Sequence, residues 1–588
     1  MINESDIKNI KATNPIKTIK RLWKYLKDYR IRINLVIILV VLTTIIQIFT
    51  PVIILIAIDD FIAKNYLENL KIILILLGTF YILTSLFNYL SSYIMTSVSE
   101  KALYIIRKDL FNHLEKLSLS FFDKHKKGDL MSRFTNDISV ISDTLSDAVI
   151  QIISSFLLLI GVTVIMFVIN PILAVTTILT VPLFFIIVVK LGEKINKYYK
   201  VRQDTVGKLN SFAEERISGI EVVKSYGKEN ETLDQFKVLN QKLKDVSVKA
   251  YMYSSLIMPT NIIVSNINNI LLIAIGSVLT LKGMATVGSI LAFLNYSKMF
   301  RRPINQLASI YSSIQTSLAG AERIFDIIDH PIEVKDVENP ITMKEIKGEV
   351  EFKNVCFGYT PEKMVLKDFN LKVKQGENVA IVGPTGAGKT TIINLLSRFY
   401  DINSGLITID GIDISKVKKA DLRKKIGIVL QDTYLFKGTI LENIKYGKMD
   451  ATIEEVIEAC KKAQAHSFIR RLPNGYDSMI EESGSNLSQG ERQLISIARA
   501  ILANHEILIL DEATSNVDTR TEVNIQKGMK KLMEGKTCFI IAHRLSTVRN
   551  VDTIVVLNHG KIVEKGNHES LMQKKGFYYN LYNSQFED

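Results

Sequence analysis

The chain has 588 residues, of which 47% are hydrophobic, and its formal net charge is +13. The length leaves room for several domains, and the mean hydropathy of +0.17 favours a membrane protein over a soluble one. The basic residues concentrate in the N-terminal arm and in loops beside apolar runs, so positive-inside topology explains them more simply than nucleic-acid binding. The cysteines Cys356, Cys460 and Cys538 have no metal-site or disulfide spacing, which suits a reducing compartment.

Residues 1–34 form a basic arm. Lysines and arginines recur along it, and Trp23, Leu26 and Tyr29 are interleaved on the opposite side. The arm is too basic, and too long before the first apolar run, to be a cleaved signal peptide. We expect an amphipathic helix at the cytoplasmic membrane interface rather than a disordered tail.

A transmembrane domain with six helices is predicted over residues 35–328. A helix needs ~20 apolar residues to cross ~30 Å of hydrocarbon, and runs that meet or approach this length lie at 35–58, 72–98, 148–169, 172–189 and 251–281. A weaker sixth run at 287–297 is followed by Lys298, Arg301 and Arg302, so we interpret it as a helix that leaves the bilayer. Charge-free runs of this length argue against a soluble helical bundle. The third and fourth runs meet at Asn170-Pro171, a very tight turn.

The connections between these runs predict the topology. Those at 59–71, 170–171 and 282–286 are short and hold few basic residues, whereas those at 99–147 and 190–250 are long and charged. The long loops therefore belong with the basic arm in the cytoplasm. They contain two landmarks, 121–137 with a helix break at Gly128 and 214–227, and loops of such length need a domain to dock on.

Polar residues interrupt two of the apolar runs. They are Gln47 in the first run and Asn261, Asn266, Asn268 and Asn269 in the fifth. Interhelical hydrogen bonds explain such residues, and a polar lining to a substrate cavity is the alternative.

Residues 329–345 form a charged linker with Pro331 and Pro340, and the composition then changes. From 346 to 588, strand-like segments alternate with helices, which predicts an α/β domain with a largely parallel sheet. The expected fold is therefore an all-α transmembrane domain followed by an α/β nucleotide-binding domain.

The strongest motif lies in this second domain. A buried strand, 379–382, leads into a glycine-rich loop that opens a helix, the strand–GxxxxGK[ST]–helix pattern of a phosphate-binding loop. Backbone N–H groups and the helix N-terminus would hold the phosphates, Lys389 would reach the β- and γ-phosphates, and the Thr390 hydroxyl would meet Mg²⁺. The residues expected to bind ATP here are Gly383, Pro384, Thr385, Gly386, Ala387, Gly388, Lys389, Thr390 and Thr391.

Two further segments complete the expected chemistry. The apolar strand 507–510 ends in Asp511, which we assign to Mg²⁺, and Glu512, which can act as general base on the attacking water. Ser488 and Gly490 stand at a helix start in Leu-Ser-Gln-Gly-Glu, a second anion site. One ATP does not need two such sites on one subunit, so this site is expected to serve the ATP of another copy.

With these motifs, the chain resembles an ATP-binding cassette (ABC) exporter half-transporter over essentially its whole length. The resemblance implies that Tyr359 stacks on adenine, Gln431 touches Mg²⁺ or water, and His543 contacts the γ-phosphate. It also implies that 121–137 and 214–227 carry coupling helices, and that Glu482 and Gly484 meet them. By the same resemblance, Ser488, Gln489, Gly490 and Glu491 form the signature that contacts the opposing ATP, and Asp518 belongs to the loop that crosses the dimer interface.

The signature departs from the family's usual LSGGQ at Gln489 and Glu491, and Glu491 brings a carboxylate near a polyphosphate. The other ATPase motifs are intact, a combination similar to one half of heterodimeric exporters. We therefore favour a heterodimer, with a homodimer as the alternative.

The expected function is ATP-driven export of amphipathic drugs or lipids from a bacterial cell, across its plasma membrane, with the nucleotide-binding domain in the cytoplasm. The expected cofactors are ATP and Mg²⁺, and the expected partners are a second half-transporter, membrane lipids and a small amphipathic substrate. A peptide exporter and an ATP-gated channel on the same fold are the alternatives. A DNA-associated or ribosomal ATPase would explain the basic charge but would not have membrane spans.

Overall fold

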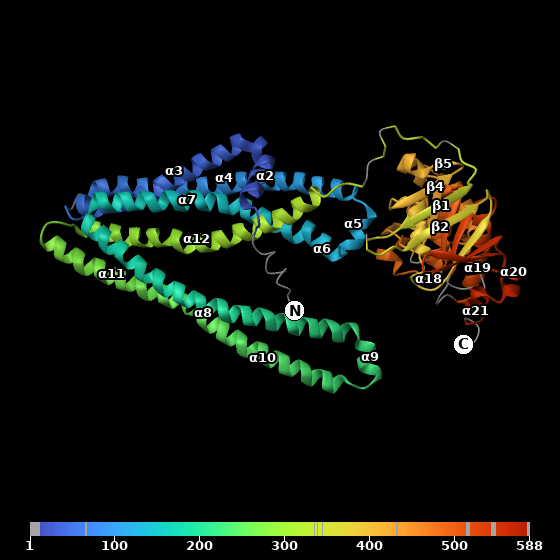
Figure 1. Cartoon of the computed structure of the whole chain (residues 1–588). Helices are drawn as coiled ribbons and strands as arrows, with labels where there is room; N and C mark the ends of the chain where they lie inside the picture. Colours follow the sequence, from blue (N-terminus) through green and yellow to red (C-terminus); the bar gives the residue numbers. More distant parts are fainter. Residues whose placement is uncertain are drawn as a thin grey trace. The chain divides into compact units, whose positions relative to one another are not determined.

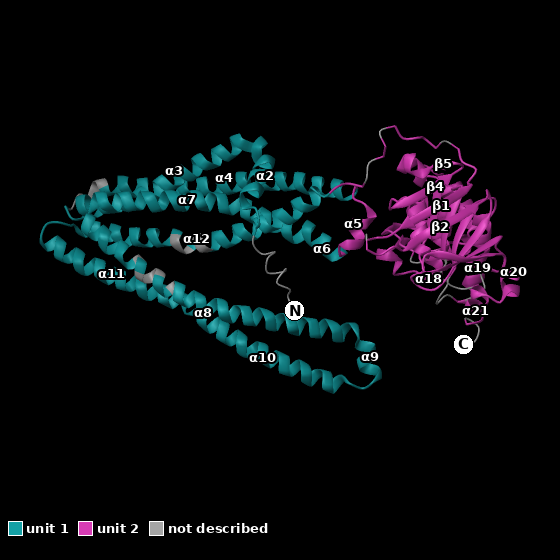
Figure 2. Cartoon of the chain, in the orientation of Figure 1, with its two compact units in different colours: residues 1–115, 127–330 teal, residues 116–126, 331–588 magenta. Residues whose placement is uncertain are grey.

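The computed structural model describes residues 12–64, 67–333, 336–337, 339–343, 345–360, 362–430, 433–512, 518–542 and 548–584. The chain divides into two compact units, and each is described by itself (Figures 1 and 2). Unit 1 comprises residues 1–115 and 127–330, and unit 2 comprises residues 116–126 and 331–588. Residues 116–126 therefore belong to unit 2 although helices of unit 1 precede and follow them.

Unit 1 is helical throughout its described elements. Its helices are α2 (Pro15–Leu26), α3 (Arg30–Ile56), α4 (Leu67–Leu114), α6 (Lys127–Ser132), α7 (Ile138–Ile169), α8 (Pro171–Ser218), α9 (Ile220–Ser225), α10 (Glu229–Ser255), α11 (Ile257–Leu281) and α12 (Val287–Ile328). Short one-turn segments lie at Lys27–Tyr29, Ala57–Ile62 and Arg133–Asp137. Helices α8 and α10 lie side by side, and α9 joins them at their far end (Figure 1).

Four helical stretches are long and apolar enough to cross a membrane: Pro15–Ile62, Leu70–Leu114, Lys127–Ile169 and Glu229–Leu281. They contain the first, second, third and fifth predicted spans. The fourth predicted span lies in α8, where the apolar stretch Pro171–Thr180 is shorter, and the sixth lies in α12. α12 runs without interruption through its basic residues and Pro303, as a helix that extends beyond an apolar first half.

Several turns in unit 1 are fixed by local hydrogen bonds. At the tight turn between α7 and α8, the Asn170 side chain accepts hydrogen bonds from the N–H groups of Ile172 and Leu173 at 3.1 and 3.2 Å. This caps α8, whose first residue Pro171 suits a helix start. The predicted break at Gly128 is displaced: α5 (Leu119–Lys124) ends before His125, and Gly128 lies inside α6.

The N-terminal helix α2 is held on the last turns of α12. The Glu322 carboxylate accepts hydrogen bonds from the N–H groups of Thr13 and Asn14 at 2.7 and 2.6 Å. Arg21 pairs with Asp329 and lies over the Phe325 ring at 4.1 Å. Leu22 and Leu26 are buried while Trp23 is half exposed, the two-sided pattern of an amphipathic helix.

Unit 2 is an α/β domain built on a six-stranded sheet. Its strand order is β12-β11-β3-β10-β9-β6, with β12 antiparallel and the other five strands parallel. These strands are β3 (Asn378–Val382), β6 (Ile426–Val429), β9 (Ile507–Glu512), β10 (Thr537–Ala542), β11 (Thr553–Asn558) and β12 (Lys561–Gly566). The apolar segments at 379–382, 507–510 and 538–541 thus form neighbouring strands, as the sequence predicts for a parallel sheet.

The remaining elements of unit 2 surround this sheet. Strands β1 (Val350–Phe357), β2 (Leu366–Val373), β4 (Ser404–Ile409) and β5 (Ile412–Asp413) form a four-stranded sheet, and β7 (Gly438–Thr439) pairs with β8 (Met479–Ile480). The helices are α5, α13 (Lys389–Leu396), α14 (Lys419–Arg423), α15 (Ile440–Lys445), α16 (Ile453–Lys462), α17 (His466–Ile469), α18 (Gln489–Ala503), α19 (Thr519–Met533), α20 (His568–Lys574) and α21 (Phe577–Asn583). Phe352 and Phe369 meet edge to face in the core between the two larger sheets.

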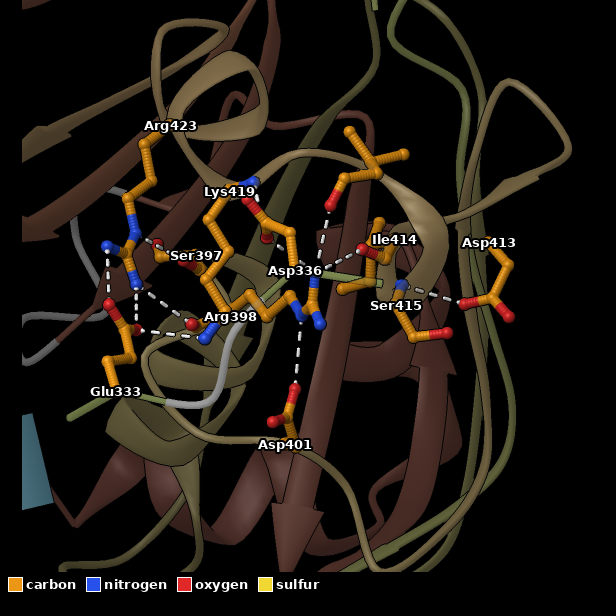
Figure 3. Close-up of polar contacts among 11 residues, drawn as sticks. Glu333, Asp336, Ser397, Arg398, Asp401, Asp413, Ile414, Ser415, Lys419 and Arg423 are labelled. Carbon is orange, nitrogen blue, oxygen red and sulfur yellow. Dashed lines mark hydrogen bonds and ion pairs between the residues drawn. The ribbon is translucent and has the colours of Figure 1, made fainter. Parts of the chain in front are cut away.

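Glu333 of the linker is tied to the rest of unit 2 by its carboxylate (Figure 3). Glu333 accepts a hydrogen bond from Arg423 at 2.6 Å and pairs with Lys419 at 3.2 Å. Arg423 also donates to the backbone oxygens of Ser397 and Arg398, which follow α13 directly. Because α13 begins in the predicted phosphate loop, these contacts fix its far end.

Replacing Glu333 with Gln should destabilise unit 2 by about 1 kcal/mol at neutral pH, a value reduced for solvent screening of a partly exposed pair. Burial alone would raise the pKa of Glu333, but the hydrogen bond and charge of Arg423, with the charge of Lys419, outweigh it and lower the pKa. The contribution is therefore present above the unfolded value near 4.5 and disappears as the pH falls through the folded pKa. Calorimetric unfolding of the full chain should show midpoints that differ at pH 7 and converge in acid.

Glu534→Gln is the matched control, because Glu534 pairs with Lys531 on the exposed surface of the same unit. Its unfolding midpoint should stay close to that of the wild type. Equal losses in the two variants, or a Glu333→Gln deficit that persists unchanged in acid, would contradict the role given to the linker pair.

Candidate nucleotide-binding site

The predicted phosphate loop connects β3 to α13 at one edge of the parallel sheet. Gly383 has φ 155°, and a Cβ there would lie 2.2 Å from the Leu557 carbonyl oxygen, so the position admits glycine alone. Gly388 caps α13 with φ 106°, again a conformation that favours glycine. The loop therefore carries its backbone past β11 and opens directly into a helix N-terminus, the arrangement that binds phosphate oxygens.

Lys389 is the buried cation of this loop. Its ammonium donates to the carbonyl oxygens of Gly383 and Pro384 at 2.7 and 3.1 Å, and the residue is 8% exposed. Burial lowers the pKa of Lys389, and the nearby carboxylate of Asp511 opposes that shift. The ammonium is thus held at the loop, where it can exchange carbonyl oxygens for phosphate oxygens.

The register of the sheet brings the acidic strand end beside the loop. Ile541 of β10 pairs with Ile381 of β3 on one side and with Asp511 of β9 on the other. Asp511 and the backbone of Glu512 therefore lie on β9, which only β10 separates from β3 and the start of the phosphate loop. The side chain of Glu512, and the residues Gln431 and His543, lie outside the described residues.

A Mg²⁺ ion fits the oxygens available here. Thr390 is an exposed hydroxyl in the first turn of α13, and Asp511 is a half-buried carboxylate at the end of β9. Among the described residues, no three His, Cys, Asp or Glu side chains gather to hold a metal by themselves. Mg²⁺ is usually held by one or two protein oxygens together with phosphates and water, so a sparse oxygen donor set suits it.

Tyr359 lies beside the first turns of α13. Its hydroxyl is 3.3 Å from the hydroxyl of Thr391 and accepts a hydrogen bond from Asn394 at 3.1 Å. Its ring meets Tyr400 edge to face with centroids 5.0 Å apart, and it is 43% exposed. Tyr400 thus packs against one side of the ring, and the exposed remainder of Tyr359 is accessible to a nucleotide base.

Sequence reasoning did not single out Tyr400, which connects this aromatic cluster to α5. Its hydroxyl donates to Asp123 of α5 within unit 2. Burial raises the pKa of Tyr400, and the hydrogen bond to the Asp123 carboxylate acts in the same direction. The available signal was an aromatic pair, Phe399-Tyr400, directly after the phosphate-loop helix.

Comparisons with known proteins agree with this geometry. Residues 33–304 match the model of the ABC transporter transmembrane region, and residues 366–515 match that of the ABC transporter. The chain is 44% identical over 580 residues to an uncharacterized ABC transporter ATP-binding protein, YfiC, of Bacillus subtilis, covering 99% of this chain and 96% of that protein. The chain belongs to the ABC transporter family.

Two further matches describe what kind of ABC transporter it resembles. It is 41% identical over 501 residues to a fatty acid ABC transporter ATP-binding/permease protein of Mycobacterium bovis, covering 85% of this chain and 79% of that protein. A solved structure of a bacterial Atm1-family ABC exporter with ATP bound matches with a TM-score of 0.75 and 32% identity, covering 95% of this chain and 98% of that chain.

The chain is therefore an ATP-driven ABC exporter half-transporter, with a helical transmembrane region followed by an α/β ATPase domain. It is a multi-pass membrane protein, and the ATPase domain of this family typically lies in the cytoplasm. The sequence-based fold class, ATPase activity and membrane location are confirmed. Half-transporters of this family dimerise.

The signature begins α18 and forms a capping box. Ser488 is the N-cap, and the Glu491 N–H donates to its hydroxyl at 3.3 Å. In return, the Glu491 carboxylate accepts hydrogen bonds from the Ser488 N–H at 3.0 Å and the Ser488 hydroxyl at 2.9 Å. Glu491 is therefore turned toward its own helix N-terminus. Either Glu or Gln can complete this S-x-x-[EQ] box. Position 491 therefore has a structural role that could not be seen by comparing the sequence with the usual LSGGQ signature.

The other ABC landmarks occupy turns around this helix. Gln489 is half-buried and Gly490 is buried in its first turn. Glu482 and Gly484 lie in a one-turn helix before the signature, and Arg492 donates to the Gly484 carbonyl at 3.1 Å. Asp518 caps α19 by accepting a hydrogen bond from the Thr521 N–H at 3.0 Å.

The capping box predicts different outcomes for two substitutions at Glu491. Glu491→Gln should leave stability nearly unchanged, because an amide oxygen can accept the same hydrogen bonds. Glu491→Ala should destabilise unit 2 by about 1 kcal/mol, because α18 loses the reciprocal cap. Calorimetric unfolding of the full chain measures both, and equal midpoints for Ala and Gln would contradict a capping role.

Proposed function

We propose that this half-transporter exports amphipathic lipids or drugs from a bacterial cell across its plasma membrane by alternating access. The observation that carries the proposal is a polar cavity of about 320 Å³ inside the helices of unit 1. Gln47 of the first predicted span lines it, together with Asn88 of α4 and Gln151 of α7. Polar side chains in a largely apolar helix bundle suit a substrate with both apolar and polar parts.

The relatives support the lipid side of this proposal. The mycobacterial relative is named as a fatty acid transporter, and a fatty acid is an amphipathic lipid. A peptide exporter is the alternative substrate class, and an ATP-gated channel is the alternative mode of action. Both would use the same ATPase domain, so transport assays separate them.

We further propose a division of roles at the ATP site. Tyr359 stacks on adenine, the loop 383–391 holds the phosphates, and Lys389 neutralises part of their charge. Glu512 acts as general base on the attacking water, and His543 contacts the γ-phosphate. Thr390, Asp511 and Gln431 are the residues that would hold Mg²⁺, which supplies charge neutralisation at the phosphates.

The second subunit completes this site in the proposal. Its residues equivalent to Ser488, Gln489, Gly490 and Glu491 meet the ATP bound to this chain's phosphate loop, and Asp518 belongs to the loop between the two sites. A Glu491 carboxylate already bonded to Ser488 occupies the hydroxyl that would otherwise meet a phosphate, so closure on ATP requires these bonds to open. Closure and hydrolysis then drive the change between inward- and outward-facing cavities.

Exposed apolar residues suggest how closure is transmitted. α9, within the predicted coupling segment 214–227, exposes Ile220, Val222 and the adjoining Tyr226. Unit 2 carries a cavity of about 550 Å³ that Tyr434, Phe436, Tyr446 and Arg499 help to line. We propose that α9 of the second subunit docks in this cavity, because its apolar residues need cover and the cavity offers aromatic surface.

The composition of the dimer is a separate proposal. Gln489 and Glu491 replace residues of the usual signature, which favours a heterodimer with a second, different half-transporter. The capping role of Glu491 weakens that argument for one of the two positions, and a homodimer is the alternative.

One experiment tests both the assignment of Glu512 as general base and the composition of the dimer. It measures the ATPase activity of this chain and of its Glu512→Gln variant, each purified alone in lipid nanodiscs. If the chain forms a working homodimer, the wild type should hydrolyse Mg-ATP, and the variant should be slower by about 10²–10⁴-fold while still binding ATP. Activity that appears only after co-expression with a neighbouring half-transporter would establish the heterodimer. Near-normal turnover in the Glu512→Gln variant would refute the assignment of the base.

Transport is tested in inside-out vesicles that contain the active dimer. ATP should drive accumulation of a fluorescent phospholipid or of the dye Hoechst 33342 against its gradient, and Glu512→Gln should abolish accumulation. ATP-dependent flux that runs only down the gradient would indicate a channel. Accumulation of a labelled peptide without either amphipath would indicate a peptide exporter.

A further inference from the structure

We propose that the exporter binds substrates with an anionic head group, in a cavity formed by Lys298, Arg301 and Arg302 of α12. This inference deepens the proposed function, on which it rests, by naming the charge of the substrate. The cavity has a volume of about 350 Å³ and lies in unit 1, between α11 and α12. Asn261, Ile262, Ser265 and Gln306 complete its described lining.

The buried cation is the central observation. Arg301 is 7% exposed, and its Nη1 atom is buried with no hydrogen-bond partner among the described residues. A guanidinium has five N–H donors, and a buried donor without an acceptor is costly. An anion in the cavity, which Arg301 lines, would neutralise the charge of the guanidinium.

The rest of the Arg301 side chain is held in place by its neighbours. Nη2 donates to the hydroxyls of Ser265 at 2.7 Å and Ser297 at 3.2 Å, and Nε donates to the Ser297 carbonyl at 3.3 Å. These contacts link α11 to α12 and fix the plane of the guanidinium. They use one edge of the group, and Nη1 has no hydrogen-bond partner among the described residues.

The side chain of Asn268 links the Ser297 hydroxyl, which contacts Arg301, to α8. Asn268 is fully buried, donates to the Ser297 hydroxyl at 2.5 Å, and accepts from the Thr180 hydroxyl at 3.2 Å. The sequence allowed two interpretations of the polar residues in the spans, interhelical hydrogen bonds and a polar cavity lining, and each describes different residues. Asn268 makes interhelical hydrogen bonds, whereas Asn261 and Gln47 line cavities.

The charge around the cavity is one-sided. Among the described residues, none of the three cations forms an ion pair with a carboxylate, and no carboxylate lines the cavity. Arg302 and Gln306 also line the polar cavity of about 320 Å³, so the two spaces adjoin. A head group bound to the cations would therefore have polar space and apolar helix surface beside it for the remainder of an amphipath.

Positive-inside topology alone accounts for part of this pattern. It explains exposed basic residues such as Lys298 and Arg302 near the cytoplasmic end of a span. It does not explain Arg301, because a topological signal has no need to be buried with an unpaired nitrogen. A ligand anion explains all three residues.

The test measures binding without ATP, using full-length dimer in nanodiscs and empty nanodiscs of the same lipids as the blank. The probes share one C16 chain: radiolabelled palmitate, hexadecyl phosphate, hexadecanol and hexadecyltrimethylammonium. We expect the two anionic probes to bind at least tenfold more tightly than the alcohol, and the cation to bind most weakly. Acetate and inorganic phosphate at the same concentrations should not displace them, if the site takes an anionic amphipath rather than a free anion.

Substitutions then locate the site. Arg301→Gln should weaken the anionic probes at least tenfold, Lys298→Gln and Arg302→Gln each severalfold, and none should change hexadecanol binding. Lys282→Gln, in the α11–α12 loop away from both cavities, is the matched control and should behave as the wild type. Because Arg301→Gln also removes bonds between helices, the exposed Lys298 and Arg302 variants keep the test decisive if Arg301→Gln does not fold.

The outcomes separate this inference from the proposed function. Equal binding of palmitate and hexadecanol, or unchanged palmitate binding in the Lys298 and Arg302 variants, would overturn the anionic site. ATP-driven accumulation of neutral or cationic amphipaths in vesicles would leave export intact in that case. Displacement by acetate or phosphate alone would overturn the claim that the ligand is an amphipath.

Discussion

Inside both units, a polar group that leaves water must find a partner, and this constraint determines where the functional positions lie. Two buried cations of unit 2 meet the constraint internally: the Lys389 ammonium bonds to two loop carbonyls, and Arg398 bonds to the carbonyls of Ile414 and Val417. In unit 1 it is met incompletely at Arg301. The difference follows from what each region holds. Lys389 can bond to carbonyl oxygens of the phosphate loop until ATP replaces them. The α12 cations Lys298, Arg301 and Arg302 form no ion pair with a carboxylate among the described residues.

The same constraint shapes the signature. The first N–H groups of α18 need acceptors, and the side chains of Ser488 and Glu491 supply them. In the proposed dimer, a phosphate of the second subunit's ATP would satisfy the same donors, so the cap and the nucleotide would compete for one helix end. In the proposed dimer this cap would have to open before the signature meets ATP, which would couple dimer closure to ATP.

How much the sequence could predict depended on how local each feature is. The phosphate loop, the strands at 379–382 and 507–510, and the turn at Asn170-Pro171 are set by neighbouring residues, and their patterns could be recognised in the linear chain. The helix break was expected at Gly128 because glycine interrupts helices, but α5 ends at Lys124, and Gly128 has space around it inside α6. The hydrogen bond from Tyr400 to Asp123 joins residues 277 positions apart, so no local sequence pattern could predict it.

The cavity formed by Lys298, Arg301 and Arg302 was the hardest feature to predict, for the same reason. In sequence, Lys298, Arg301 and Arg302 are a basic cluster that ends a span, and positive-inside topology accounts for them fully. What distinguishes Arg301 is its surroundings. Ser265 of α11 and Ser297 of α12 accept its hydrogen bonds, and Asn268 links Ser297 to Thr180 of α8. The guanidinium is buried, and one of its nitrogens has no acceptor among the described residues. Burial of a charge is a property of the packed helices rather than of the α12 sequence. The substrate preference of such an exporter is therefore to be found on helix faces that meet only after folding, which is why its ATPase motifs identify the family without naming the cargo.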